Sequence, residues 1–161
     1  LDLAICREPT PLPQGFGFRA ALQDGFVVVC RPQHPLTRQA TVTAAELLAQ
    51  RRLAPPLTGL GPQQVESLFD ELGGVPELCR VSSRPTEIMH AMLADSDMLA
   101  CAPASLVRPL VQRGELAVLP WNSQAVGPLG VLVKAEVLAS QTHPCLRFVA
   151  HALAPGSGLR H

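Results

Sequence analysis

Two short stretches of the sequence carry polar side chains suited to binding a small ligand. Ser83, Arg84 and Thr86 stand where the chain predicts the start of a helix, and Thr58 and Gly59 lie in a glycine-rich turn before another predicted helix. A carboxylate could accept bonds from free N–H groups of a helix start and a charge-assisted bond from Arg84. A sugar could instead bond to the hydroxyl groups. The sequence leaves both chemistries open.

A purely structural role is the alternative for both stretches. Ser83 is of a type that commonly caps helices, and Arg84 could then be a solvated side chain. Thr58 and Gly59 could simply form their turn.

The elements around Ser83 predict half of a βαβ unit. A helix begins there with Ile88, Ala91 and Met92 on one face, and the polar turn 94–97 follows it. The next run, 98–102, is apolar without alternation, which is typical of a parallel strand covered on both faces. Ligands of open α/β sheets bind beyond the carboxyl ends of such strands, where helices begin.

The rest of the chain also alternates between strand and helix patterns, which predicts the α/β class with a parallel or mixed sheet. Turn 23–25 separates two of the strands. We expect one lobe over 22–119 and a second, partial lobe made of 1–21 and 120–161, joined by two crossings. The other expected strands are 1–5, 18–22, 26–30, 52–55, 77–81, 116–119 and 129–133, and the other expected helices are 42–50, 63–72, 104–113 and 144–153.

Composition excludes several classes of protein. The formal net charge is zero, 47% of the residues are hydrophobic and 16% are charged, so the chain is neither a basic nucleic-acid surface nor disordered. The five cysteines are widely spaced without a CxxC pair, which predicts reduced thiols, and the five histidines have no metal-ligand spacing. We expect no metal and no cofactor. No signal peptide or membrane span is expected, so we predict a cytoplasmic protein. The start at Leu1 suggests a fragment.

The acidic residues do not predict an enzyme. Asp95 and Asp97 belong to a turn, where carboxylates commonly bond to the backbone. Glu66, Asp70 and Glu71 are typical of a solvated helix face. The sequence lacks a nucleophile beside a base and a phosphate-binding glycine loop with its lysine.

Several segments, in order along the chain, resemble the effector-binding domain of LysR-type transcriptional regulators. They are LDLAI, DGFVVVCRPQHPL, VTAAELL, VSSRPTEIMHAML with DMLACAP, GELAVLP and GVLVKAEVLASQTHPCLRFV. His34 of the HPL segment is expected to be structural. The turn 94–97 departs from the glycine-containing turn of most members. With 126–130, it is similar to the branch that includes regulators of galactose-binding-protein genes.

The resemblance implies two Rossmann-like lobes with mixed sheets, similar to type 2 periplasmic binding proteins, with the first lobe incomplete. A small polar effector, a carboxylate or a sugar, would bind between the lobes. DNA binding would belong to an N-terminal winged helix-turn-helix that this chain does not contain. The family implies a homodimer or tetramer, and Leu68 and Leu72 are our candidates for part of its interface. The alternatives are a solute-binding protein of a transporter and a dimerisation module without a ligand.

Overall fold

The chain forms two compact units in the computed structural model, which describes residues 3–53, 62–79, 86–123, 127–139, 144, 146–147 and 151. Unit 1 comprises Leu1–Asp24 and Gly127–His161, and unit 2 is the segment Gly25–Val126 between them. The chain passes from unit 1 to unit 2 after Asp24 and back after Val126. Both positions lie later in the sequence than the expected ones, after residues 21 and 119. The second lies later because the strand expected to end at 119 continues through Pro120 to Ser123. A proline is tolerated there since this strand is at the edge of its sheet.

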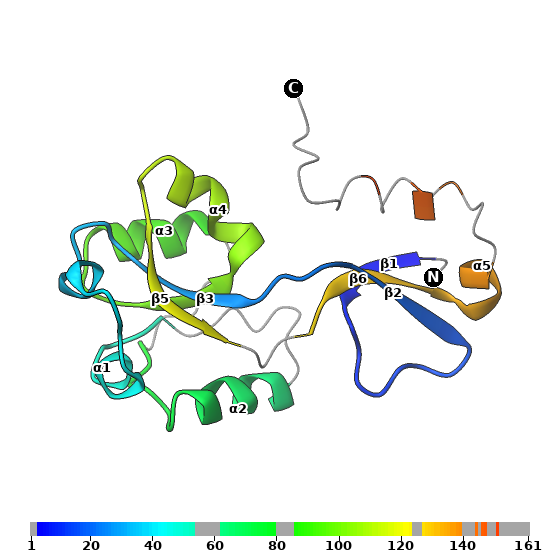
Figure 1. Ribbon diagram of the computed structural model, residues 1–161, viewed down its shortest axis with the longest axis horizontal. Coiled ribbons are helices and arrows are strands. Elements are labelled where there is room, and N and C mark those ends of the chain that lie inside the picture. Colours follow the sequence, from blue (N-terminus) through cyan, green and yellow to red (C-terminus); the bar gives the residue numbers. More distant parts are fainter. Residues whose placement is uncertain are drawn as a thin grey trace. The chain divides into compact units, whose positions relative to one another are not determined.

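Unit 1 contains a three-stranded antiparallel sheet (Figure 1). Strand β6 (Leu129–Lys134) lies between β1 (Leu3–Arg7) and β2 (Phe16–Leu22). Its small core is formed by Val131, Val133 and Leu146, with Leu3, Val137 and Leu138 packed against it. The short helix α5 (Ala135–Ala139) was not predicted, because five residues are too few to show a helical period.

Gly130 gives unit 1 a specific packing requirement. A β-carbon at Gly130 would collide with the backbone carbonyl group of Arg19 and meet the Phe18 ring at 2.5 Å. We expect Gly130→Ala to lower the free energy of unfolding by about 2 kcal/mol, because the β2 backbone must move. Gly17→Ala is the matched control, since its β-carbon would meet only the flexible Leu138 side chain. Urea unfolding measures both; equal losses would contradict this account.

Unit 2 is built around a mixed sheet with helices on both faces. Strand β3 (Phe26–Cys30) pairs antiparallel with β4 (Ala100–Pro103) on one side and with β5 (Ala117–Ser123) on the other. Single bridges at Arg52 extend the sheet in parallel, one to Leu78 and one to Leu99. The parallel expectation for 98–102 is therefore confirmed toward Arg52, whereas the same segment is antiparallel to β3.

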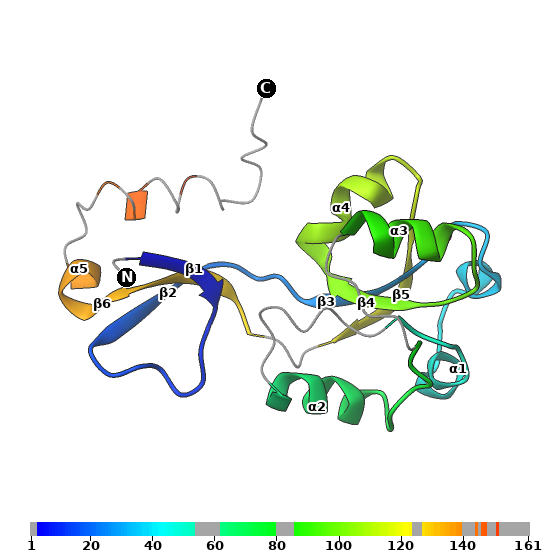
Figure 2. The same cartoon turned by 180° about the vertical axis from the view of Figure 1, so that it is seen from behind.

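The helices divide between the two faces of this sheet, as Figures 1 and 2 show from opposite sides. Helices α1 (Ala44–Leu48) and α2 (Pro62–Glu71) cover one face, and α3 (Thr86–Ala94) and α4 (Ala104–Gln112) cover the other. Each face has its own core. The first includes Phe26, Leu47, Leu68, Leu72 and Cys101, and the second includes Met89, Leu93, Ala100 and Val107.

Local sequence signals fixed several helix ends. The pattern Thr43-Ala44-Ala45-Glu46 predicts a capping box, and the structure contains it: the Thr43 hydroxyl accepts from the Glu46 N–H at 3.2 Å, and Glu46 accepts from the Thr43 N–H at 2.8 Å. The bond from the Thr43 N–H to the carboxylate lowers the pKa of Glu46, and a bond of 2.7 Å from the Thr43 hydroxyl to the same carboxylate acts in the same direction. Glycines after the helical patterns predict where two helices end: Gly73 and Gly114 follow α2 and α4 with φ of +76° and +71°, a conformation that disfavours side chains.

One expectation about local structure was wrong. The buried face of α3 carries Met89 and Leu93, whereas Ile88 and Ala91 are exposed. Because six of the nine residues of this helix are apolar, the 3.6-residue period does not single out one face. The turn at 23–25 lies between β2 and β3, which belong to different sheets, and the chain passes between the units here.

Candidate effector-binding site

Most residues predicted to bind the effector lie outside the described residues. This holds for Thr58, Gly59, Ser83 and Arg84. Thr86 is described: it is the first residue of α3 and is half-buried. The strands and helices on either side of these predicted binding residues are described.

Three parallel segments of unit 2 define one edge of its sheet. The Arg52 N–H donates to the Glu77 carbonyl at 2.9 Å, and the Cys79 N–H donates to the Arg52 carbonyl at 2.6 Å. On the other side, the Leu53 N–H donates to the Leu99 carbonyl at 2.9 Å. Since these segments run in the same direction, the chain leaves all of them at the same edge.

A helix follows each of these segments along the chain. Helix α2 follows the segment that contains Arg52, α3 follows the one that contains Leu78, and α4 begins directly after β4. Free N–H groups at helix starts beyond the carboxyl ends of strands are a common arrangement for binding polar and anionic ligands. Residues 58–59 fall within the first connection and residues 83–84 within the second.

Arg52 is a polar residue near this edge that the sequence analysis missed. Its side chain is only 2% exposed, and none of its three guanidinium nitrogens has a hydrogen-bond partner among the described residues. Burial lowers the pKa of Arg52, and the nearby Cys101 thiol acts in the opposite direction. Arg51 and Arg52 are neighbours in the sequence. Successive side chains of a strand point to opposite faces, so one of these two arginines points inward, but the sequence does not indicate which one.

His34 is structural, as expected. Its Nδ1 accepts a bond from the Leu36 N–H at 3.2 Å, so the ring proton is on Nε2, which donates to the Asp97 carbonyl at 3.1 Å. The histidine thereby caps the 3₁₀ helix η1 (Pro35–Arg38). Asp97 also pairs with Arg31 at 2.7 Å through its carboxylate, not with the backbone as expected. Arg31, His34 and Asp97 lie next to the amino end of β4. They are therefore at the edge of the sheet opposite the one where the three helices begin.

His90, Arg113 and Glu115 form a cluster of titratable groups at the surface of this unit. Glu115 bonds to Arg113 and lies 3.5 Å from Nε2 of His90; Arg113 lowers the pKa of Glu115 most strongly. Across the described ranges, no group of three His, Cys, Asp or Glu residues is arranged to hold a metal ion.

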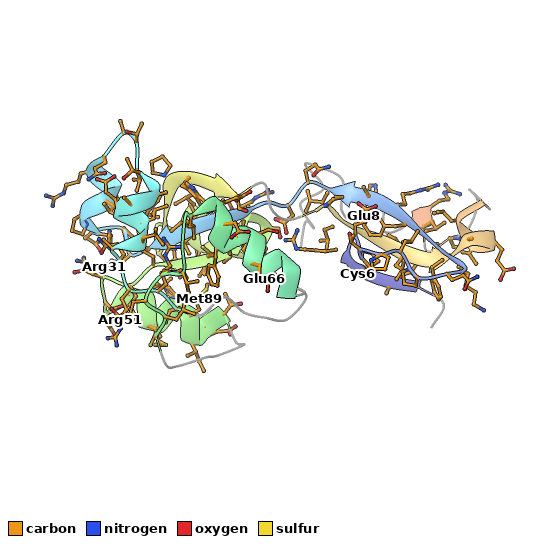
Figure 3. All side chains as sticks on the ribbon, turned by 90° about the horizontal axis from the view of Figure 1, so that it is seen from below. Cys6, Glu8, Arg31, Arg51, Glu66 and Met89 are labelled. Carbon is orange, nitrogen blue, oxygen red and sulfur yellow. The ribbon has the colours of Figure 1, made fainter. Side chains whose placement is uncertain are left out.

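Leu68 and Leu72 do not face outward. Their side chains are 1% and 0% exposed and belong to the core beneath α2. The described exposed positions of this helix include Glu66, which Figure 3 labels, and the acidic residues Asp70 and Glu71. The apolar stripe that suggested an interface is therefore the stripe that packs on the sheet.

Comparisons with known proteins agree with this architecture. Residues 1–154 match the family model of the LysR substrate binding domain. The regulatory domain of MetR, a LysR family regulator from N. meningitidis, has a TM-score of 0.68 at 19% identity, covering 94% of this chain and 68% of that one. The Synechocystis CcmR regulatory domain in complex with 2-PG has a TM-score of 0.70 at 19% identity, covering 94% and 71%.

A curated relative matches a shorter stretch. The SDS degradation transcriptional activation protein of a Pseudomonas strain is 32% identical over 96 residues, which is 58% of this chain and 30% of that protein. Full-length CbnR complexed with its target DNA has a TM-score of 0.67 at 17% identity, covering 95% of this chain and 52% of that one.

The fold is the two-unit α/β fold of bacterial regulatory domains that resemble periplasmic binding proteins. The chain belongs to the LysR substrate-binding-domain family. It spans about a third of the length of the curated activator that it matches. In the part of the chain that the structure describes, no helix is long and apolar enough to cross a bilayer.

Proposed function

We propose that this chain is the effector-sensing part of a cytoplasmic LysR-type DNA-binding regulator. The observation that carries the proposal is the edge of unit 2 at which three parallel segments end and three helices follow. Family membership, the ligand in the CcmR complex and the DNA in the CbnR complex support the role of sensor for a transcription regulator. DNA contacts would be made by another part of a longer protein.

The proposed effector is a small polar metabolite, either a carboxylate or a sugar. Ser83, Arg84 and Thr86 would bind it at the start of α3, with Thr58 and Gly59 contributing from the preceding connection. The direction of the strands supports this set, because both connections leave the sheet at one edge. By binding one conformation more tightly than another, the effector would shift the equilibrium that the DNA-binding part reads.

We further propose that the regulator is a homodimer or a tetramer, as the family implies. Leu68 and Leu72 are no longer candidates for the contact, because they pack inside unit 2. The acidic exposed side of α2 does not favour two copies meeting through this helix, since like charges repel.

Arg84→Ala tests the binding site. The melting temperature of the purified chain is measured with acetate, citrate, galactose and glucose, and the class that raises it is titrated against the variant. If Arg84 binds an anionic effector, the substitution should weaken binding roughly 10- to 100-fold, the loss of one charge-assisted hydrogen bond.

Arg108→Ala is the control, because Arg108 is an exposed arginine on α4. It should leave the affinity unchanged. An anion that binds the Arg84 variant as tightly as the natural chain would contradict the role of Arg84. A purely sugar-dependent shift would contradict the anionic effector but not the sensing role.

A further inference from the structure

Arg52 is a buried cation inside unit 2. Its side chain is 2% exposed, and its strand neighbours are Leu78 and Leu99. None of its three guanidinium nitrogens has a hydrogen-bond partner among the described residues. An ionised group that is buried without a partner is strongly destabilising, so a group of this kind normally faces an anion.

Unit 2 has no carboxylate to serve as that anion. The sequence from Gly25 to Val126 contains nine acidic residues, and all nine lie in described parts of the chain. Each of them is exposed or half-exposed at the surface. Several already have partners there: Glu77 pairs with Arg51, Asp97 with Arg31 and Glu115 with Arg113. The stretches of unit 2 that the structure does not describe contain no aspartate or glutamate.

The Cys101 thiol cannot take this place at neutral pH. Cys101 lies beside Arg52, and the guanidinium alone would favour its thiolate. Burial has the larger effect and raises the pKa of Cys101 to about 11. The thiol is therefore uncharged at pH 7, and the positive charge of Arg52 is unbalanced within the unit.

The position of Cys101 also gives the direction of the Arg52 side chain. Leu99 is the strand neighbour of Arg52, and Cys101 follows it two residues further along the same segment. The guanidinium therefore extends toward the edge at which the parallel segments end and α2, α3 and α4 begin. Helix starts at that edge favour negative charge.

We propose that Arg52 binds a small external oxyanion, namely a carboxylate, sulfate or phosphate group, within unit 2. The planar guanidinium presents paired N–H donors that match two oxygens of such a group. The bound anion would neutralise the buried charge and stabilise the folded unit. This inference goes beyond the proposed function, because it requires an anion at Arg52 whether or not that anion is the transcriptional effector.

Arg52→Met tests the site against Arg51→Met as the matched control. Arg51 is the adjacent arginine; its side chain is 58% exposed and lies at the periphery of unit 2 (Figure 3). The melting temperatures of the natural chain and both variants are measured in sodium acetate, sulfate and phosphate, each against sodium chloride of equal ionic strength. The general salting effect of these anions is common to all three proteins and cancels in the comparison.

We expect at least one of these anions to raise the melting temperature of the natural chain and of Arg51→Met by about 3 °C or more beyond the rise in Arg52→Met, at tenfold excess over its Kd. The anion that gives this difference identifies the group bound. Arg52→Met should itself melt higher in chloride than the natural chain, because it removes an uncompensated buried charge. Equal responses of all three proteins would overturn the proposal.

Cys101→Asp is a second test that does not depend on the folding of the methionine variant. It places a carboxylate beside the guanidinium, so the counter-charge comes from the chain itself. This variant should melt higher than the natural chain in chloride and lose the anion response. A Cys101→Asp protein that keeps the full response would overturn the proposal. Neither result bears on Arg84, whose test can fail independently.

Discussion

Replacing Arg7 with methionine is expected to lower the free energy of unfolding of unit 1 by about 3–5 kcal/mol. Nη1 of Arg7 donates to the carbonyl oxygens of Asp24 and Gly127 at 2.7 and 2.9 Å, and Nη2 pairs with the Asp24 carboxylate at 3.0 Å. The two charged side chains are only 9% and 4% exposed. Removing one member of a buried ion pair takes away the opposite charge that the other member faces, which accounts for the large expected loss.

The effect should be concentrated where the chain passes between the units. Asp24 is the last residue of unit 1 before unit 2 begins, and Gly127 is the first after it ends. The Arg7 guanidinium therefore bonds to both of the residues that flank unit 2 in the sequence. Limited proteolysis of Arg7→Met should cut near these two residues faster than in the natural chain, because the backbone there loses its hydrogen-bond donor.

Urea unfolding measures the stability loss, with Arg19→Met as the control. Arg19 is a half-buried arginine on β2 of the same sheet. A double-mutant cycle with Asp24→Asn separates the charge interaction from the two carbonyl bonds. A loss no larger for Arg7→Met than for Arg19→Met would show that the Arg7 cluster contributes little stability.

The sequence predicted the parts of the fold that depend on local chemistry. The Thr43–Glu46 capping box and the glycines at 73 and 114 fix their helix ends through contacts within a few residues, so the pattern alone reveals them. Strand partners depend on contacts between distant parts of the chain. This explains why the sequence did not show that β3 pairs antiparallel with both β4 and β5.

The candidate site was predictable to the extent that it follows from strand order. A helix start after an apolar strand marked residues 83–86, and the parallel bridges of Arg52 support the edge on which this prediction depends. Arg52 itself could not be found in this way. Arginine is rarely buried, and only the tertiary structure shows that Arg52 points inward while Arg51 pairs with Glu77.

A second large effect is expected at alkaline pH, where unit 2 should lose about 3 kcal/mol of stability by pH 10. Burial raises the pKa of both Cys30 and Cys101 to about 11, against an ordinary value of 9.0. Between these values the unfolded chain releases protons that the folded unit keeps. Stability is therefore fully present below pH 9 and falls as the pH rises toward 11, by about 1.4 kcal/mol per thiol at pH 10.

The composition of this chain makes the experiment unusually clear. The sequence contains no tyrosine and a single lysine, the exposed Lys134, so few other side chains titrate between pH 8 and pH 11. Urea unfolding at intervals across this range should show the decline in the natural chain and in Cys6→Ala, which alters unit 1. Cys30→Ala with Cys101→Ala should start less stable but decline much less. Because both thiols lie in the core beneath α1 and α2, an unchanged decline in this double variant would mean that another part of the chain opens first.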